Sequence, residues 1–277
     1  MDNWKQHPLF DKLLNDAADV LDRIYTHPFN EELADGTLPP SSFSKFLIQD
    51  SFYLSSYAEA MQVVTDRLQG SHKESFQTFV TETKELQNCV HNTFVPQYCS
   101  NSFKVDQVAN SDQTDQVANS VLWTQEANSV CLAYTRHLLT AAKQGTIEES
   151  VVSLFPCFYV YHELGCKGAS KLQTSNPYYS WISGYTNYPS FTQSVERFMQ
   201  ILVDVSTKED QKETEAAVQR MSLAFLQSCE HEWNFIQDVY ACHYPFRVTV
   251  LSPTDSHSTD SQCTSSDSLS SSPNSTA

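Results

Sequence analysis

Residues 43–68 read FSKFLIQDSFYLSSYAEAMQVVTDRL, and the spacing of their apolar residues decides the fold class. Phe43, Phe46, Leu47 and Leu54 follow one another at helical intervals, which is the stripe of a helix that packs on a core. The same pattern predicts helices from Leu14 to Tyr25 and over 72–95, 130–143, 147–164, 191–205 and 208–240. Alternating β-branched runs that would indicate strands are nearly absent. The sequence therefore predicts an all-α domain of about seven to nine helices.

The charge of the chain excludes several classes of partner. The sequence holds 33 acidic and 17 basic residues, which gives a formal net charge of −16. Such a chain is unsuited to neutralising nucleic-acid phosphates or to docking on anionic membranes. No apolar run approaches the roughly 20 residues that a membrane span needs. The first residues, MDNWKQ, also lack the basic start and apolar stretch of a secretory signal. We therefore expect a cytoplasmic protein with neither a nucleic-acid nor a membrane partner.

The cysteine and histidine patterns argue against metal chemistry. Eight cysteines are scattered without a CxxC pair, which is typical of reduced thiols and not of a zinc site. His162-Glu163 and His231-Glu232 both lack the second histidine of HExxH, and no Glu-x-x-His occurs in the chain. The sequence predicts neither a bound metal nor a cofactor.

Two segments stand apart from the helical pattern. Val108-Ala109-Asn110-Ser111 recurs at 117–120, and Ala127-Asn128-Ser129 follows at the same nine-residue interval. Three short polar copies indicate a tandem duplication in a surface loop, at about 99–126. Residues 252–277 contain eleven serines and one large aliphatic residue, so this tail should be disordered. The predicted organisation is a helical domain over 1–250 and a disordered tail over 251–277.

A few polar residues lie in apolar helical settings. The spacing of Asp50, Tyr53 and Tyr57 places them on one face of a largely apolar helix. A carboxyl on such a face is costly unless it has a hydrogen-bond partner, and a tyrosine hydroxyl could be that partner. Cys157 follows Pro156, a residue that predicts a helix break or start, and lies four residues before Tyr161. Cys157 could be a small residue of the apolar core, or it could be a nucleophile if a base lies near its thiol.

The segment from Cys229 to Phe235 offers a candidate acid. Glu230 and Glu232 are two residues apart and therefore point to different faces of a helix. The one that faces inward beside aromatic rings would have a raised pKa, which suits proton transfer. Spacing alone does not choose between them.

Five segments, taken together, resemble the TenA (thiaminase II) family over roughly Trp4 to Tyr244. They are His27-Pro28-Phe29 with Leu33-Ala34-Asp35-Gly36-Thr37-Leu38-Pro39, Leu47-Ile48-Gln49-Asp50-Ser51-Phe52-Tyr53-Leu54, Ala133-Tyr134-Thr135-Arg136-His137-Leu138, the run from Pro156 through Cys157, Tyr161 and His162 to Gly165, and Asn176-Pro177-Tyr178 with Trp181-Ile182-Ser183-Gly184-Tyr185. The repeat and the Ser-rich tail depart from the family pattern without touching these motifs.

The resemblance implies a haem-oxygenase-like helical fold and a homotetramer. It also implies hydrolysis of 4-amino-5-aminomethyl-2-methylpyrimidine to the hydroxymethylpyrimidine in thiamin salvage, with intact thiamin as a secondary substrate. The formylated aminopyrimidine is a third candidate substrate. Because Cys157 is present, the chain resembles the cysteine class of the family.

The resemblance also assigns roles to residues. Cys157 would be the nucleophile and Glu232 the acid and base, preferred to Glu230 because Glu232-Trp233-x-Phe235 matches the family's run. Asp50 would bind the amidine-like edge of the pyrimidine. Four tyrosines would form the rest of the pocket. Tyr53 would flank the pyrimidine ring, and the other three would orient the substrate or the thiol: Tyr134, Tyr161 and Tyr185.

Three other interpretations stay open at this point. The fold could bind pyrimidine or thiamin without catalysis, although Cys157, Glu232 and Asp50 are all present. It could be a cofactor-independent oxidase of the pyrroloquinoline-quinone synthesis type, which would call for a basic pocket. It could also be a purely structural helical module, with Asp50 and Cys157 as ordinary buried residues.

Overall fold

The computed structural model describes residues 7–102, 126–168, 172–186 and 189–241. Within helices, the side chains of residues 100–102, 185, 186, 189 and 190 lie outside the description. All regular structure in the described ranges is helical, without a strand, so the predicted all-α class is confirmed. The predicted tail and the first two repeat copies lie outside the described residues.

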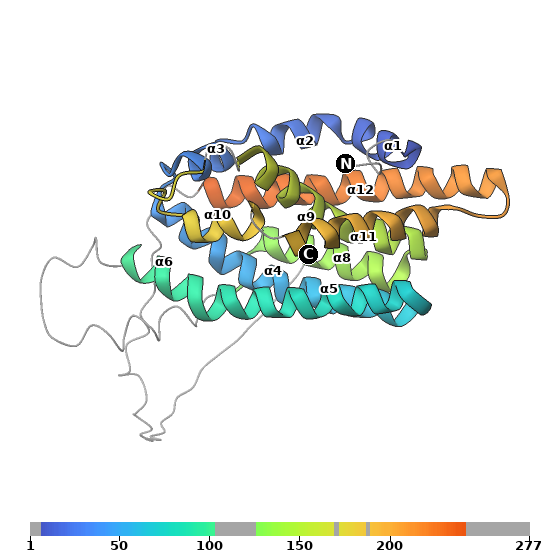
Figure 1. The fold of residues 1–277 in the computed structure, drawn as a ribbon, viewed down its shortest axis with the longest axis horizontal. Helices are drawn as coiled ribbons and strands as arrows, with labels where there is room; N and C mark the ends of the chain where they lie inside the picture. Colours follow the sequence, from blue (N-terminus) through green and yellow to red (C-terminus); the bar gives the residue numbers. More distant parts are fainter. Residues whose placement is uncertain (1–6, 103–125, 169–171, 187–188, 242–277) are drawn as a thin grey trace, which may run out of the picture. The chain divides into compact units, whose positions relative to one another are not determined.

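The helices of the described ranges are α1 (Pro8–Asp16), α2 (Ala18–Tyr25), α3 (Pro28–Asp35), α4 (Pro40–Arg67), α5 (Gly70–Cys89), the π-helical segment η2 (Val90–Phe94), α6 (Val95–Ser102), α8 (Ser129–Gln144), α9 (Ile147–Gly168), α10 (Tyr179–Thr186), α11 (Pro189–Ser206) and α12 (Gln211–Tyr240) (Figure 1). Helices α4, α8, α9, α11 and α12 follow the predicted ranges closely, whereas the helix predicted from Leu14 to Tyr25 is divided at Ala17, and α3 and α10 lie outside the predicted ranges. Helix α6 continues past residue 99, where the sequence places the start of the insertion.

Helix α4 lies at the centre of the helical packing. It contacts α5, α8, α6, α12 and α9, and α9 in turn packs on α12 and α11. The apolar stripe of 43–68 provides its buried side: Phe43 and Leu47 are 0% exposed and Phe46 is 1% exposed. This arrangement brings α4, α8, α9 and α12 together around one interior region.

Two of the sequence motifs meet at the end of α3. The His27 ring caps the helix by accepting from the Phe29 backbone N–H at 3.1 Å, and Gly36 ends it with a φ of 80°. The Asn176 amide donates to the Leu33 and Ala34 carbonyls at 3.0 and 2.9 Å. A Cβ on Gly36 would lie 2.9 Å from the Pro177 Cδ. The glycine is therefore required both by its backbone conformation and by close packing.

The helix break predicted at Pro156 is wrong. Helix α9 runs without interruption from Ile147 to Gly168, with Pro156 inside it. Proline removes one backbone donor, but the residues around it are buried, and tertiary packing can offset the cost. In addition, the Tyr57 hydroxyl donates to the Leu154 carbonyl at 2.5 Å. Cys157 is therefore presented from within a continuous helix.

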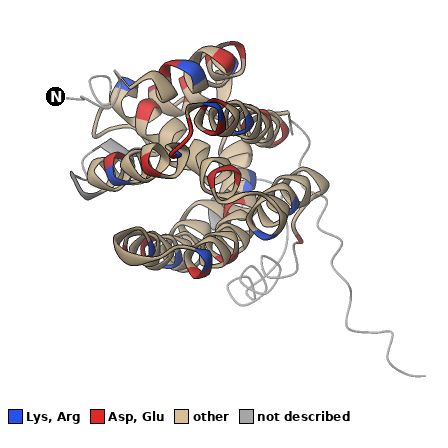
Figure 2. Cartoon of the chain, turned by 90° about the vertical axis from the view of Figure 1, so that its right-hand side faces the viewer, with Lys and Arg blue, Asp and Glu red and all other residues tan. Residues whose placement is uncertain are grey.

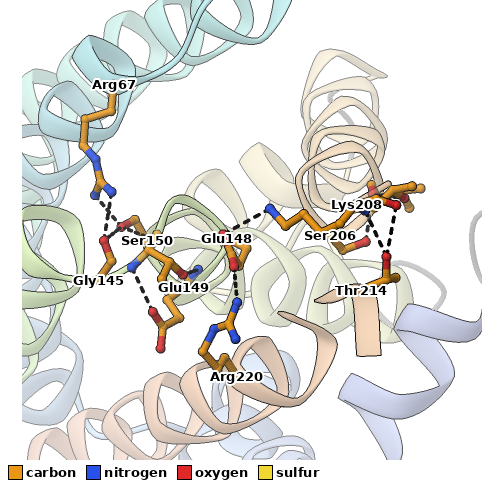
Figure 3. Close-up of polar contacts among 12 residues, drawn as sticks. Arg67, Gly145, Glu148, Glu149, Ser150, Ser206, Lys208, Thr214 and Arg220 are labelled. Carbon is orange, nitrogen blue, oxygen red and sulfur yellow. Dashed lines mark hydrogen bonds and ion pairs between the residues drawn. The ribbon is translucent and has the colours of Figure 1, made fainter. Parts of the chain in front are cut away.

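A polar network joins the N-terminus of α9 to α4, α8 and α12 (Figure 3). The buried Glu148 accepts from Arg220 at 2.5 Å and pairs with Lys208 at 3.5 Å. The Arg67 guanidinium donates to the Gly145 carbonyl at 2.8 Å and to the Ser150 hydroxyl at 2.7 Å. Burial alone would raise the pKa of Glu148, but its Arg220 hydrogen bond and the nearby Lys208 charge lower it overall. This carboxyl is therefore ionised and structural.

Figure 2 shows acidic and basic residues distributed over several helices of the described part of the chain. No helix within the described ranges is both long and apolar enough to span a membrane.

Candidate active site

Six of the predicted site residues come from four helices that surround one interior region. They are Asp50 and Tyr53 on α4, Tyr134 on α8, Cys157 and Tyr161 on α9, and Glu232 on α12. The Tyr134 hydroxyl donates to Glu232 Oε2 at 2.9 Å, which joins α8 to α12. The Tyr53 ring lies 4.8 Å from the Tyr134 ring, which joins α4 to α8.

Glu232 is a buried carboxyl with few compensating partners. Its residue is 2% exposed, and burial raises its pKa from 4.5 to about 7. Hydrogen bonds from Tyr134 and Tyr161 act in the opposite direction and hold this pKa down. A carboxyl with a pKa near neutrality can both give and take a proton at physiological pH.

Asp50 is a second buried carboxyl, 7% exposed. Burial, followed by the nearby Glu232 charge, raises its pKa from 3.8 to about 8. Because each carboxyl disfavours ionisation of the other, the two titrate as a coupled pair. Near neutral pH at least one of them carries a proton.

Cys157 lies beside both carboxyls. Its side chain is partly accessible even though protein atoms surround the sulfur. Burial, followed by the charges of Glu232 and Asp50, raises the thiol pKa well above its usual value, while the Tyr53 hydroxyl lowers it. That hydroxyl is near the thiol, yet it forms no hydrogen bond of ordinary geometry with a described residue. The thiol is therefore protonated at rest and needs a base when it reacts.

Glu230, the alternative acid, points away from this cluster. Its carboxylate pairs with Arg23 at 2.6 Å, and 44% of its side chain is exposed. The two glutamates lie on different faces of α12, and the one that faces the buried cluster is Glu232. The backbone of Tyr185 belongs to α10, but the side chain of this predicted pocket residue lies outside the description.

Three residues without a predicted role also line the cluster. Tyr57 stacks on Tyr53 with ring centroids 5.3 Å apart, Phe235 lies 6.0 Å from Tyr53, and His231 stacks on Tyr134 at 5.4 Å. Phe235 follows Glu232 by three residues, which places both side chains on one helix face. This spacing could have identified Phe235 as a residue that lines the cluster. The contact of His231 depends on how α8 packs on α12, which no local pattern reports.

The surroundings of the cluster limit what else it could hold. In the described part of the chain, no group of three or more His, Cys, Asp or Glu side chains is arranged around a possible metal ion. A mainly apolar cavity of about 70 Å³ lies between α3, α4, α9 and α10. Tyr161 lines this cavity, whereas Asp50, Cys157 and Glu232 do not.

A family model described as the TENA/THI-4/PQQC family matches residues 14–67 and 116–242. The chain belongs to this family. An aminopyrimidine aminohydrolase of Halalkalibacterium halodurans is 25% identical over 213 residues, which cover 72% of this chain and 84% of that protein. The aminopyrimidine aminohydrolase of Bacillus subtilis is 24% identical over 236 residues, which cover 79% and 84%. The resemblance found in the sequence is confirmed, and these relatives support a hydrolase of thiamin metabolism.

Solved structures of TENA/THI-4/PQQC family relatives share the fold. The TenA homologue from P. horikoshii has a TM-score of 0.61 at 25% identity, covering 84% of this chain and 98% of that one. The TenA homologue from Pyrococcus furiosus has a TM-score of 0.66 at 17% identity, covering 84% and 100%. All six described site residues lie inside the two segments that the family model matches.

Proposed function

We propose that this chain is an aminopyrimidine aminohydrolase. It would replace the amino group on the methylene of 4-amino-5-aminomethyl-2-methylpyrimidine by a hydroxyl group, consuming one water and releasing one ammonia. The observation that carries the proposal is the buried cluster of one thiol and two carboxyls of raised pKa, walled by tyrosines. The names of the two relatives support the same reaction class.

The protonated, neutral carboxyl of Asp50 would recognise the pyrimidine. The edge made by a ring nitrogen and the adjacent amino group offers one acceptor and one donor. A neutral carboxyl offers the complementary donor and acceptor, whereas a carboxylate offers acceptors only. With a pKa of about 8, Asp50 is mostly neutral at physiological pH. The burial that raises its pKa therefore also suits it to this edge.

Cys157 and Glu232 would carry the chemistry. Glu232, as the carboxylate, takes the thiol proton while the sulfur adds to a ring carbon, and it passes this proton to a ring nitrogen. Electrons then return from that nitrogen and expel the protonated amino group from the methylene as ammonia, leaving an exocyclic double bond. Glu232 takes a proton from water as the oxygen adds to this carbon. Departure of the sulfur restores the aromatic ring and the free thiol.

Stacked aromatic rings would hold a flat heterocycle in place. Tyr53, Tyr57 and Tyr134 are all buried, with neighbouring ring centroids about 5 Å apart. A buried aromatic wall also excludes bulk water, which strengthens the effect of each proton donor.

The test is release of ammonia and hydroxymethylpyrimidine from 4-amino-5-aminomethyl-2-methylpyrimidine, with Cys157→Ser beside the wild type. The matched control is Cys99→Ser, a buried thiol on α6 whose Sγ is 3.8 Å from the Ser44 carbonyl. We expect turnover by the wild type and the control, and a loss of about a thousandfold or more in Cys157→Ser. Thermal stabilisation by the pyrimidine without turnover would instead indicate a binding protein. The predicted homotetramer is a separate proposal, tested by light scattering.

A further inference from the structure

A second polar cluster lies on three of the same helices, and Asn128 is its centre. The Asn128 Oδ1 caps α8 by accepting from the Cys131 backbone N–H at 2.9 Å. Its own backbone N–H donates to Gln49 Oε1 on α4 at 2.9 Å. Its side-chain amide donates to Asp238 Oδ2 on α12 at 2.7 Å. One residue thus binds the start of α8 to both neighbouring helices.

The partner of Asn128 on α12 is itself fixed to α4. The Lys45 ammonium lies 2.9 Å from Asp238 Oδ2 and donates to the Asp238 backbone carbonyl at 2.7 Å. Only 8% of the Lys45 side chain is exposed. Asp238 is half-buried, and its hydrogen bonds to Lys45 and Asn128 fix the position of its carboxyl relative to α4 and α8.

The contact between Asn128 and Asp238 lies in register with the contact in the candidate site. Tyr134 is six residues after Asn128 on α8, and Glu232 is six residues before Asp238 on α12. Both offsets correspond to about 9 Å along a helix. The His137 ring meets the Ser228 hydroxyl at 2.8 Å one turn further along. Asn128–Asp238, Tyr134–Glu232 and His137–Ser228 are therefore successive rungs between two antiparallel helices.

The same cluster reaches the substrate-binding carboxyl. Gln49 directly precedes Asp50, and the Cys131 thiol donates to the Gln49 carbonyl at 3.6 Å. Burial, followed by the charges of Asp50 and Asp238, raises the pKa of Cys131, and this thiol lies near the carboxyls of both clusters. The start of α8 is thereby fixed against the part of α4 that carries Asp50.

We propose that Asn128 is a positioning residue that sets the register of α8 against α12 and so keeps the Tyr134 hydroxyl on the Glu232 carboxyl. A slip of one residue along a helix is about 1.5 Å, enough to break a hydrogen bond of 2.9 Å. The effect on turnover rests on the proposed function. The effect on helix register does not.

No sequence pattern indicates this role. Asn128 belongs to the third copy of the nine-residue repeat, and by pattern it is equivalent to Asn110 and Asn119. What separates Asn128 is its place at the N-cap of α8, opposite Asp238. The last copy of the repeat is therefore joined to the site.

Asn128→Ser tests the proposal, because serine keeps an N-cap acceptor and removes the amide donor to Asp238. The matched control is Asp210→Ser at the N-cap of α12, where Asp210 accepts from the Lys212 and Glu213 N–H groups at 2.7 and 3.1 Å. We expect both variants to keep their thermal midpoints within a few degrees. Asn128→Ser alone should lose about ten- to a hundredfold in kcat.

A pH profile separates positioning from simple destabilisation. The Tyr134 hydrogen bond holds down the pKa of Glu232, so loosening it should move the limb of the rate profile governed by Glu232 to higher pH. The titratable groups that face Glu232 are Asp50, Tyr53 and Tyr57 from α4, Tyr134 from α8, Cys157 and Tyr161 from α9, and Cys229 from α12 itself, and neither variant replaces any of them. Equal kinetics and an equal pH profile in Asn128→Ser and Asp210→Ser would overturn the proposal.

A readout without turnover keeps the two hypotheses distinguishable. A double-mutant cycle of thermal midpoints compares four proteins: the wild type, Asn128→Ser, Tyr134→Phe and the double variant. The two substituted residues are not in contact with each other. We expect the two shifts to be non-additive, since each variant weakens the same register. Additive shifts would refute the positioning role. A wild type that turns over no aminopyrimidine would refute the proposed function and leave this cycle valid.

Discussion

Replacing Glu232 by glutamine should stabilise the fold while it removes activity. The folded-state pKa of Glu232, about 7, lies above its ordinary value of 4.5 because the carboxyl is buried. The folded chain therefore holds the proton more tightly than the unfolded chain does. The stability from this group is fully present below pH 4.5 and is lost as pH rises through about 7.

The size of this effect follows from the two pKa values. A rise from 4.5 to about 7 corresponds to about 3 kcal/mol at pH 8, and to about 1 kcal/mol at pH 5. Glutamine cannot ionise, keeps nearly the same shape, and still offers an oxygen to the Tyr134 hydroxyl, whose bond is 2.9 Å long. Glu232→Gln should therefore exceed the wild type in unfolding free energy, and the advantage should grow by about 2 kcal/mol from pH 5 to pH 8.

Urea unfolding of both proteins at several pH values measures this difference. Glu230→Gln is the matched control: it makes the same change two residues away, at an exposed ion pair with Arg23 that contributes little. The control should show no growing advantage with pH. A pH-independent difference for Glu232→Gln, or a loss of stability at pH 8, would refute the reasoning. Turnover by Glu232→Gln should fall by about a hundredfold or more.

Three other substitutions test separate parts of the structure. Asp50→Asn should bind the hydroxymethylpyrimidine at pH 9 better than the wild type does, because Asp50, with a pKa of about 8, loses its donor as pH rises, which calorimetry can measure. Glu148→Gln should lower the unfolding free energy by about 1–3 kcal/mol in urea, because it weakens the pairing of the partly exposed Arg220. Gly36→Ala should lower it by about 1–3 kcal/mol, because its φ is 80° and its Cβ would lie 2.9 Å from Pro177.

Each of these has its own control. Asp50→Ala offers neither donor nor acceptor and should bind weakly at every pH, and equal binding by Asp50→Asn and Asp50→Ala would contradict the role of that edge. Glu59→Gln removes an exposed pair with Lys143 at 3.3 Å and should change stability little. Gly168→Ala places a Cβ with no atom within 4 Å, so a loss equal to that of Gly36→Ala would count against the packing argument.

Local periodicity carried most of the fold. The spacing of Phe43, Phe46 and Leu47 predicted α4 within three residues at either end, because an amphipathic stripe reflects a helix's own geometry. Pro156 is the exception. Its local preference against a helix interior was outweighed by burial in α9, a contribution that depends on other helices and that no window of sequence contains.

Sequence patterns alone indicate that the chain is helical and, through motif resemblance, which six described residues belong to the candidate site. The packing of the helices shows that Glu232 and not Glu230 faces Asp50 and Cys157, that His231 stacks on Tyr134, and that Asn128 reaches Asp238. The two kinds of information differ in the sequence distance over which the interactions act. Helix formation depends on neighbours a few residues apart, whereas a raised pKa or a shared hydrogen bond depends on segments a hundred residues apart that packing alone brings into contact.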